Sequence, residues 1–172
     1  MIFSLAKPDE TDAVWQIYAA AVPDQNQKGI FHWDEEYPTR DIIENDIAER
    51  KCYVVRENGV PVAVLRIDGE QHPAYQTVDW KYGEPYICVH RLCVHPRAQG
   101  KGLAKHIMKD VLALYSFKGY AAVRLDTYRH NWIAMRLYEG LGFERRQTVH
   151  FEGRGDREYM CFEINLTGSD IC

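Results

Sequence analysis

The chain has 172 residues, of which 46% are hydrophobic and 27% charged, a composition typical of a folded domain and unlike that of a disordered chain. Its 21 Lys and Arg against 25 Asp and Glu give a net charge of -4 without a basic stripe, so we expect no nucleic-acid partner. The apolar runs are far shorter than the ~20 residues of a membrane span, and residues 1–9 lack the pattern of a secretory signal. We therefore expect no membrane partner either.

The five cysteines form an odd set without a C-x-x-C pair: Cys52, Cys88, Cys93, Cys161 and Cys172. The first four stand in apolar, strand-like runs, where a thiol packs as a small hydrophobic group. This pattern favours a reducing, cytoplasmic location, and it predicts neither a disulfide framework nor a bound metal.

The first half of the chain predicts two helices and three strands. The expected elements are a strand at 2–6, a helix at 9–22, a polar connection at 23–38, a helix at 39–50, and strands at 52–56 and 60–67. Asn58-Gly59 between the last two strands is typical of a β-hairpin turn.

The second half predicts alternating strands and helices. The expected elements are strands at 86–94, 121–127, 143–151 and 157–165, and helices at 103–117 and 131–141. The order β-α-α-β-β-β-α-β-α-β-β implies one sheet with helices on its faces. We expect a single domain over residues 1–166 and a short C-terminal tail at 167–172.

A glycine-containing turn follows the strand at 86–94. Gly100 and Gly102 stand just before the helix that begins at Leu103, whose first amides lack internal partners and carry about half a positive elementary charge. A phosphate or pyrophosphate would fit there, although a plain strand-to-helix turn also explains the glycines. Because Lys101 is followed by Gly102, and because the turn comes after the fourth strand, neither a P-loop nor a Rossmann fingerprint fits.

Two sequence blocks resemble those of a known family. Gln99-x-x-Gly102-x-Ala104 matches an acetyl-CoA signature, and the residues from Asn131 to Phe143 match a second block about 30 residues later. On these blocks the chain resembles the GNAT superfamily of N-acetyltransferases, closely over residues 86–145. The resemblance implies an α/β (α+β) fold with a mixed, mainly antiparallel sheet of about seven strands and helices on both faces. It also implies acetyl-CoA as the acetyl donor.

The resemblance places the donor on two segments. The pyrophosphate is expected on the backbone amides of Gln99, Gly100, Lys101, Gly102, Leu103 and Ala104, and the pantetheine arm along Leu92, Cys93 and Val94. A backbone N–H of that strand end would polarise the thioester carbonyl. Asn131 would contact the pantetheine. Asn131 also stands at a helix N-cap position, and the two roles can coexist.

Tyr138 and His90 are the predicted catalytic residues. Tyr138 would give its proton to the leaving thiolate, although its place on the apolar face of a helix is explained equally well by burial. His90 has the spacing of a histidine in arylalkylamine N-acetyltransferases and would take the proton of the amine; a strand histidine bonded to backbone or solvent is the alternative. Cys88 stands where histone-acetylating relatives carry a glutamate, so Glu84 and Asp79 are reserve bases.

The acceptor is expected at the connection between the first two helices. In this superfamily that connection lies over the acceptor pocket, and Trp33, Glu36 and Tyr37 would suit a cationic amine with an apolar body. A solvated loop with Trp33 docked on the core explains these residues as well. The loop at 68–85 is a candidate to close the pocket.

The chain is thus predicted to be an acetyl-CoA-dependent N-acetyltransferase. It would acetylate a primary amine of a small molecule or peptide by direct attack in a ternary complex, without a covalent intermediate on Cys93. The resemblance also makes a homodimer a candidate state, since members of this superfamily frequently dimerise through final strands such as the strand at 157–165, but the sequence does not decide between a monomer and a dimer. The alternatives are a non-catalytic acyl-CoA-binding or sensing module, and an enzyme that acylates aminoacyl-tRNA, for which the net charge of -4 is unfavourable.

Overall fold

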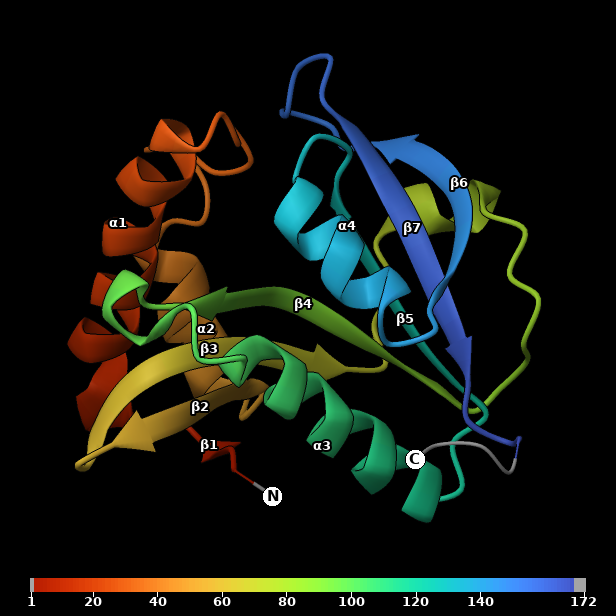
Figure 1. Cartoon of the computed structure of the whole chain (residues 1–172), viewed down its shortest axis with the longest axis horizontal. Helices are drawn as coiled ribbons and strands as arrows, with labels where there is room; N and C mark the ends of the chain where they lie inside the picture. Colours follow the sequence, from red (N-terminus) through yellow and green to blue (C-terminus); the bar gives the residue numbers. More distant parts are fainter. Residues whose placement is uncertain (1, 169–172) are drawn as a thin grey trace. The chain divides into compact units, whose positions relative to one another are not determined.

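The computed structural model describes residues 2–168 (Figure 1). The helices are α1 (Thr11–Gln27), α2 (Arg40–Ala48), α3 (Leu103–Phe117) and α4 (Trp132–Glu139), and three 3-10 turns are η1 (Pro8–Glu10), η2 (Pro73–Thr77) and η3 (Pro96–Ala98). The strands are β1 (Ser4–Leu5), β2 (Cys52–Glu57), β3 (Val60–Asp68), β4 (Tyr86–Val94), β5 (Ala122–Tyr128), β6 (Glu144–His150) and β7 (Glu158–Asn165). Residues 169–172 of the predicted tail, Cys172 among them, lie outside the described residues.

The seven strands form one sheet in the order β1-β2-β3-β4-β5-β7-β6. β4 pairs with β5 in parallel, whereas the pairs β1–β2, β2–β3, β5–β7 and β6–β7 are antiparallel. The predicted fold class and element order are therefore confirmed. β7, the candidate strand for self-association, is an inner strand with both of its edges paired, and β6 is the edge strand.

The chain divides into two compact units. One consists of Met1–Ile67 and His90–Ile107, and the other of Asp68–Val89 and Met108–Cys172. We call them unit 1 and unit 2 and describe each by itself.

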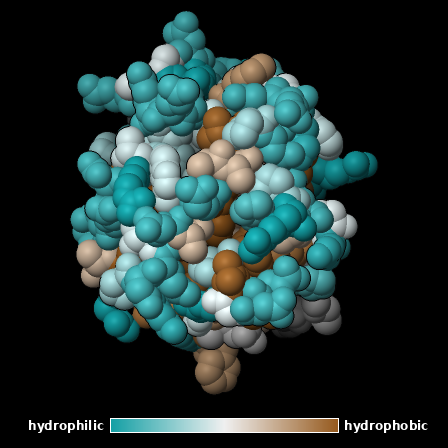
Figure 2. Space-filling view, turned by 90° about the vertical axis from the view of Figure 1, so that its left-hand side faces the viewer, coloured by the Kyte–Doolittle hydropathy of each residue, from teal (hydrophilic) through white to brown (hydrophobic). Residues whose placement is uncertain are grey.

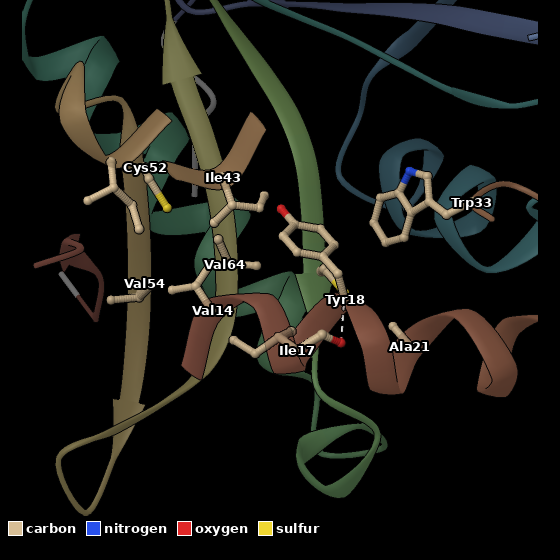
Figure 3. Close-up of a cluster of buried hydrophobic side chains, with 11 residues drawn as sticks. Val14, Ile17, Tyr18, Ala21, Trp33, Ile43, Cys52, Val54 and Val64 are labelled. Carbon is tan, nitrogen blue, oxygen red and sulfur yellow. Dashed lines mark hydrogen bonds between the residues drawn. The ribbon is translucent and has the colours of Figure 1, made fainter. Parts of the chain in front are cut away.

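The core of unit 1 is built on one face of α1 (Figure 3). Val14, Ile17, Tyr18 and Ala21 repeat at the spacing of a helix face and are buried in one cluster that also contains Val54 and Val64 of the β2–β3 hairpin and Trp33. The hairpin turn at Asn58-Gly59 has positive φ at both residues, as its sequence predicts.

α1 is longer than predicted, because it continues through Pro23 to Gln27. A proline lacks the amide hydrogen of a helical turn and predicts the end of a helix, so the expected boundary at residue 22 is wrong. Tertiary contacts on both sides of Pro23 account for the extension. Ala21 packs into the core, and Lys28, just after the helix, bonds both Asp24 and Gln99.

The core of unit 2 is largely aromatic. Tyr75, Val78, Cys88, Val149, Tyr159 and Cys161 form one buried cluster, against which Trp80, Tyr86, Tyr128 and Phe151 pack. The connection between β3 and β4 contributes Tyr75 and Val78 to this cluster. That connection is therefore an integral part of the core of unit 2.

Figure 2 shows one face of the molecule, on which hydrophilic side chains cover most of the surface. Hydrophobic residues are visible there mainly in the recesses between them. Over residues 2–168, no helix has both the length and the apolar character needed to cross a bilayer.

Candidate functional site

The turn between β4 and α3 is an exposed backbone cradle in unit 1. Gly100 has φ of 77° and Gly102 has φ of 73°, a region that glycine occupies without strain. A Cβ added at Gly100 would meet nothing within 4 Å, so the space beside the turn is open. Gly100, Lys101 and Gly102 are exposed, and α3 begins directly after them at Leu103. Backbone amides at the start of a helix are a favourable site for an anion.

Hydrogen bonds hold this turn in place at its base. Gln99 donates from Nε2 to the carbonyl of Val94 over 3.0 Å, and its Oε1 accepts from Lys28 over 2.9 Å. His95 accepts at Nδ1 from the amide of Arg97 over 3.2 Å and therefore caps η3. The Gln99 side chain thus stabilises the turn, and the Gln99 amide donates to the carbonyl of Pro96 over 3.2 Å, so the amides left for a ligand begin at Gly100.

The strand end before the turn contains one buried thiol between two half-buried residues. Cys93 is buried among core residues of unit 1, 3.9 Å from the carbonyl of Ile17, whereas Leu92 and Val94 are half-buried. Burial raises the pKa of the Cys93 thiol. A buried thiol with a raised pKa is a poor nucleophile.

Arg91 gives β4 an unusual backbone conformation directly before Leu92. It has φ of 51°, which is uncommon for a residue with a side chain. The hydroxyl of Tyr18 donates to the carbonyl of Arg91 over 2.9 Å, and the guanidinium donates to Tyr37 over 3.2 Å and also to Asp46. Three separate segments (α1, the α1–α2 connection and α2) therefore hold this one residue.

Asp46 is the anion at the centre of this arrangement. It is 2% exposed and accepts hydrogen bonds from Arg66, over 2.8 Å, and from Arg91. A buried carboxylate shared by two guanidinium groups is favourable only as long as all members remain, because each charge has lost its hydration.

Replacing Asp46 by Ala is expected to lower the free energy of unfolding of the protein by about 3–5 kcal/mol, since it leaves two arginines without their buried counter-ion. Urea unfolding followed by circular dichroism measures this. The control is Glu44→Ala, which removes an exposed ion pair with Arg40 on the same helix and should have little effect. Equal stability of the two variants would contradict the assignment.

The remaining predicted residues of unit 1 lie in different environments. His90 is half-buried on β4. Trp33 is 3% exposed, with its ring centroid 5.2 Å from that of Tyr18, so its position favours the packing role over substrate contact. Glu36 is exposed, and Tyr37 is half-buried against Arg91. Tyr37 is thus hydrogen-bonded to β4 through Arg91.

Tyr138 lies on α4 in unit 2, packed between aromatic rings. It is 6% exposed, and its ring centroid is 5.7 Å from those of both Phe143 and Phe162. Burial, followed by the charge of Asp126, raises the pKa of Tyr138, so the phenol keeps its proton. Within residues 2–168 its hydroxyl has no hydrogen-bond partner, and it is therefore available to a ligand.

Asn131 is the N-cap of α4. Its Oδ1 accepts from the amide of Ala134 over 3.1 Å, and the residue is 7% exposed. The amide group Nδ2 makes no hydrogen bond within the described part of the chain. The capping role is observed, and it leaves the NH2 group, with its two N–H donors, for a cofactor.

A carboxylate not singled out in the sequence lies on β5. Asp126 is half-buried and accepts from the hydroxyl of Tyr75 over 2.5 Å. Its negative charge also contributes to the pKa of Cys88, which burial raises to about 12. The reserve bases Glu84 and Asp79 are exposed, whereas Asp126 is half-buried and bonded to Tyr75 of the aromatic core.

The loop at 68–85 is fixed to the sheet by a second buried carboxylate. Glu163 of β7 is 0% exposed and accepts from Arg124 over 3.0 Å, from Arg146 over 3.2 Å and from the amide of Lys81 over 2.8 Å. Arg124 also lies 4.7 Å from the ring centroid of Trp80. These contacts anchor the loop to the sheet of unit 2.

Arg91, Asp46 and Asp126 are the residues that sequence reasoning missed. The only sign of them in the sequence is a charged residue inside an otherwise apolar strand or helix face. Such a position predicts a partner, because a charged side chain is rarely buried without one. Among residues 2–168, no three His, Cys, Asp or Glu side chains cluster as a metal site would require.

Comparison with known proteins places the chain among acetyltransferases. The sequence model of the Acetyltransferase (GNAT) family matches residues 11–143. The L-2,4-diaminobutyric acid acetyltransferase of Vibrio cholerae is 32% identical over 94 residues, 49% of this chain and 54% of that protein. An uncharacterized N-acetyltransferase of Schizosaccharomyces pombe is 23% identical over 73% of this chain and 78% of its own length. The chain therefore spans about half the length of the first of these curated relatives.

Solved structures show the same fold. A GNAT-family acetyltransferase from Streptococcus agalactiae has a TM-score of 0.83 at 21% identity, covering 95% of this chain and 94% of its own. The yncA structure from Salmonella typhimurium, solved with its cofactor acetyl-CoA, has a TM-score of 0.68 at 18% identity and covers 96% of this chain and 94% of its own. The predicted family resemblance is confirmed.

Proposed function

The chain belongs to the Acetyltransferase (GNAT) family, and from this premise we propose that it transfers an acetyl group from acetyl-CoA to a primary amine. The exposed turn of Gly100, Lys101 and Gly102 at the start of α3 is the observation that carries the proposal. Its open backbone amides suit the pyrophosphate of acetyl-CoA. The structure of the Salmonella typhimurium relative with acetyl-CoA supports this choice of donor.

The donor would extend from this turn along the backbone of Leu92, Cys93 and Val94. A backbone N–H there would donate to the thioester oxygen, where negative charge develops, and such a donor contributes about 3–4 kcal/mol to transition-state stabilisation. The anchored conformation of Arg91 would fix the direction of the amides that follow it. Asn131 would offer its Nδ2 to the pantetheine arm.

Tyr138 would act as the general acid. A protonated phenol without a protein partner can donate to the departing thiolate of coenzyme A. The bond from carbon to sulfur breaks as the bond from carbon to the amine nitrogen forms, and the sulfur takes the phenolic proton.

Direct attack by the amine is favoured over an acetylated cysteine. The raised pKa and burial of Cys93 leave little thiolate for a covalent step. The base that accepts the amine proton would be His90, with Asp126 as the carboxylate alternative.

The two candidate bases predict different losses of activity. If His90 accepts the amine proton, His90→Ala should lower kcat/KM about 10²–10⁴-fold, and Asp126→Asn should have little effect. Initial rates of coenzyme A release measure both variants. If His90→Ala keeps the unmodified rate and Asp126→Asn loses it, the base is Asp126.

The acceptor would be an amine of a small molecule or a peptide. The name of the Vibrio cholerae relative, L-2,4-diaminobutyric acid acetyltransferase, supports a small amino-acid-like amine. The four buried thiols suit a reducing cytoplasm, where we expect the protein to act, either alone or as a homodimer.

A screen of primary amines for acetyl-CoA-dependent release of coenzyme A tests the proposal, with calorimetric titration of acetyl-CoA in parallel. Turnover with at least one amine is the expected result. Binding of acetyl-CoA without turnover of any amine would favour the non-catalytic sensing module. Absence of binding would overturn both functions.

A further inference from the structure

α4 and the strands β6 and β7 of unit 2 line a cavity of about 730 Å³ that the proposed transfer does not use. We propose that this cavity binds a small amphipathic anion, a molecule with a flat apolar body and one carboxylate. The proposal concerns residues outside those assigned to donor binding, and it stands independently of the proposed acetyl transfer.

The apolar part of the cavity comes from both of its walls. Trp132 and Met135 line it from α4, and Met160 lines it from β7. Met135 is 9% exposed, whereas Trp132 is 57% exposed, one of the most exposed large hydrophobic side chains described. Together, an exposed indole and two methionine side chains offer a flat and adaptable surface to an apolar ring.

The charge of the cavity is positive, although the protein as a whole has a net charge of -4. Three arginines line it (Arg129, Arg136 and Arg145), and Glu139 is the only acidic residue among its lining residues. Arg129 pairs with Glu158, and Arg145 pairs with Glu139. Two of the three cations are thus already compensated.

Arg136 is the third arginine of the cavity lining. Its guanidinium makes no hydrogen bond or ion pair with any residue between 2 and 168, and the side chain is exposed. Arginine binds carboxylates through two parallel N–H donors. A carboxylate held by Arg136 would place an attached ring within reach of Trp132, one turn earlier on the same helix.

The cavity and the proposed catalytic residue lie on neighbouring faces of α4, with Met135 between them. Asn131 and Tyr138 are seven residues apart, about two turns, and both are buried, whereas Trp132, Arg136 and Glu139 are exposed. None of the residues assigned to acetyl-CoA lines the cavity. Binding in the cavity should therefore not require an empty donor site.

Methionine methyl groups report on the cavity directly. The chain has four methionines, of which Met135 and Met160 line the cavity, while Met108 is fully buried elsewhere in unit 2. Protein labelled with ¹³C at the methionine methyl groups is titrated with 2-naphthylacetate in saturating coenzyme A. We expect saturable shifts of the signals of Met135 and Met160, with that of Met108 unchanged.

The contribution of the negative charge is tested with a matched ligand and a matched variant. 2-Naphthylacetamide has the same shape without the charge and should bind about tenfold more weakly. Arg136→Gln should lose this preference for the carboxylate. Arg50→Gln, which removes an exposed cation of unit 1, should keep it.

Three outcomes would overturn the proposal. One is the absence of saturable shifts of Met135 and Met160, and another is equal affinity for the carboxylate and the carboxamide. The third is a change of the same two signals with protein concentration in the absence of the probe, which would show that a second copy of the chain occupies the cavity.

Discussion

Replacing Gly102 by Glu is expected to abolish the binding of acetyl-CoA, with a loss of affinity of at least about 100-fold. The substitution brings a carboxylate to the amides that would hold the pyrophosphate. This carboxylate would compete with the phosphates of the ligand for the positive end of α3. A Cβ at this position would lie 3.8 Å from the ring of His106, an ordinary contact distance, so the Cβ of the new side chain has room. Calorimetric titration of acetyl-CoA measures the affinity.

Two controls separate charge from backbone strain. Gly102→Ala has the same unfavourable positive φ, which costs about 1–2 kcal/mol, but brings no charge. Gly119→Glu combines a positive φ and a new carboxylate at the other end of α3. Both should bind acetyl-CoA better than Gly102→Glu does. If Gly102→Glu binds acetyl-CoA like the unmodified protein, the pyrophosphate is not bound at this turn.

The substitution Tyr138→Phe should lower kcat about 100-fold and leave the affinity for acetyl-CoA nearly unchanged. Phenylalanine keeps the ring packing against Phe143 and Phe162 and removes only the hydroxyl. Steady-state rates and calorimetric titration on the same preparation give the two quantities.

A second tyrosine provides the control for this variant. Tyr115→Phe removes a hydroxyl from another buried ring, on α3, and should keep the unmodified kcat. Thermal unfolding of both variants shows whether the fold is retained. An undiminished kcat in a folded Tyr138→Phe protein would exclude the phenol as the acid.

The elements around the site were predictable because their signals are local. The predicted bounds of β4 and α3 agree with the structure to the residue, since Pro96 follows the strand and since Gly102 and Gly119 flank the helix. The extension of α1 beyond Pro23 was not predictable, because it depends on tertiary contacts.

The charged partners of the site could not be predicted for a similar reason. Arg91 and Asp46 are 45 residues apart in the sequence, and Tyr75 and Asp126 are 51 apart. No local pattern links such pairs, and only the folded chain brings them together. Trp33 illustrates the same limit, since its aromatic character alone suited both a ligand contact and the core position that it occupies.

The burial of the cysteines has a practical consequence for assays. Cys52, Cys88, Cys93 and Cys161 are all buried thiols, and burial raises the pKa of each of them. A chromogenic disulfide reagent reacts with exposed thiolates, so these four should stay silent in the native protein. Such a reagent can therefore follow the free coenzyme A of each turnover continuously, with little background from these side chains, and added denaturant should make all four react.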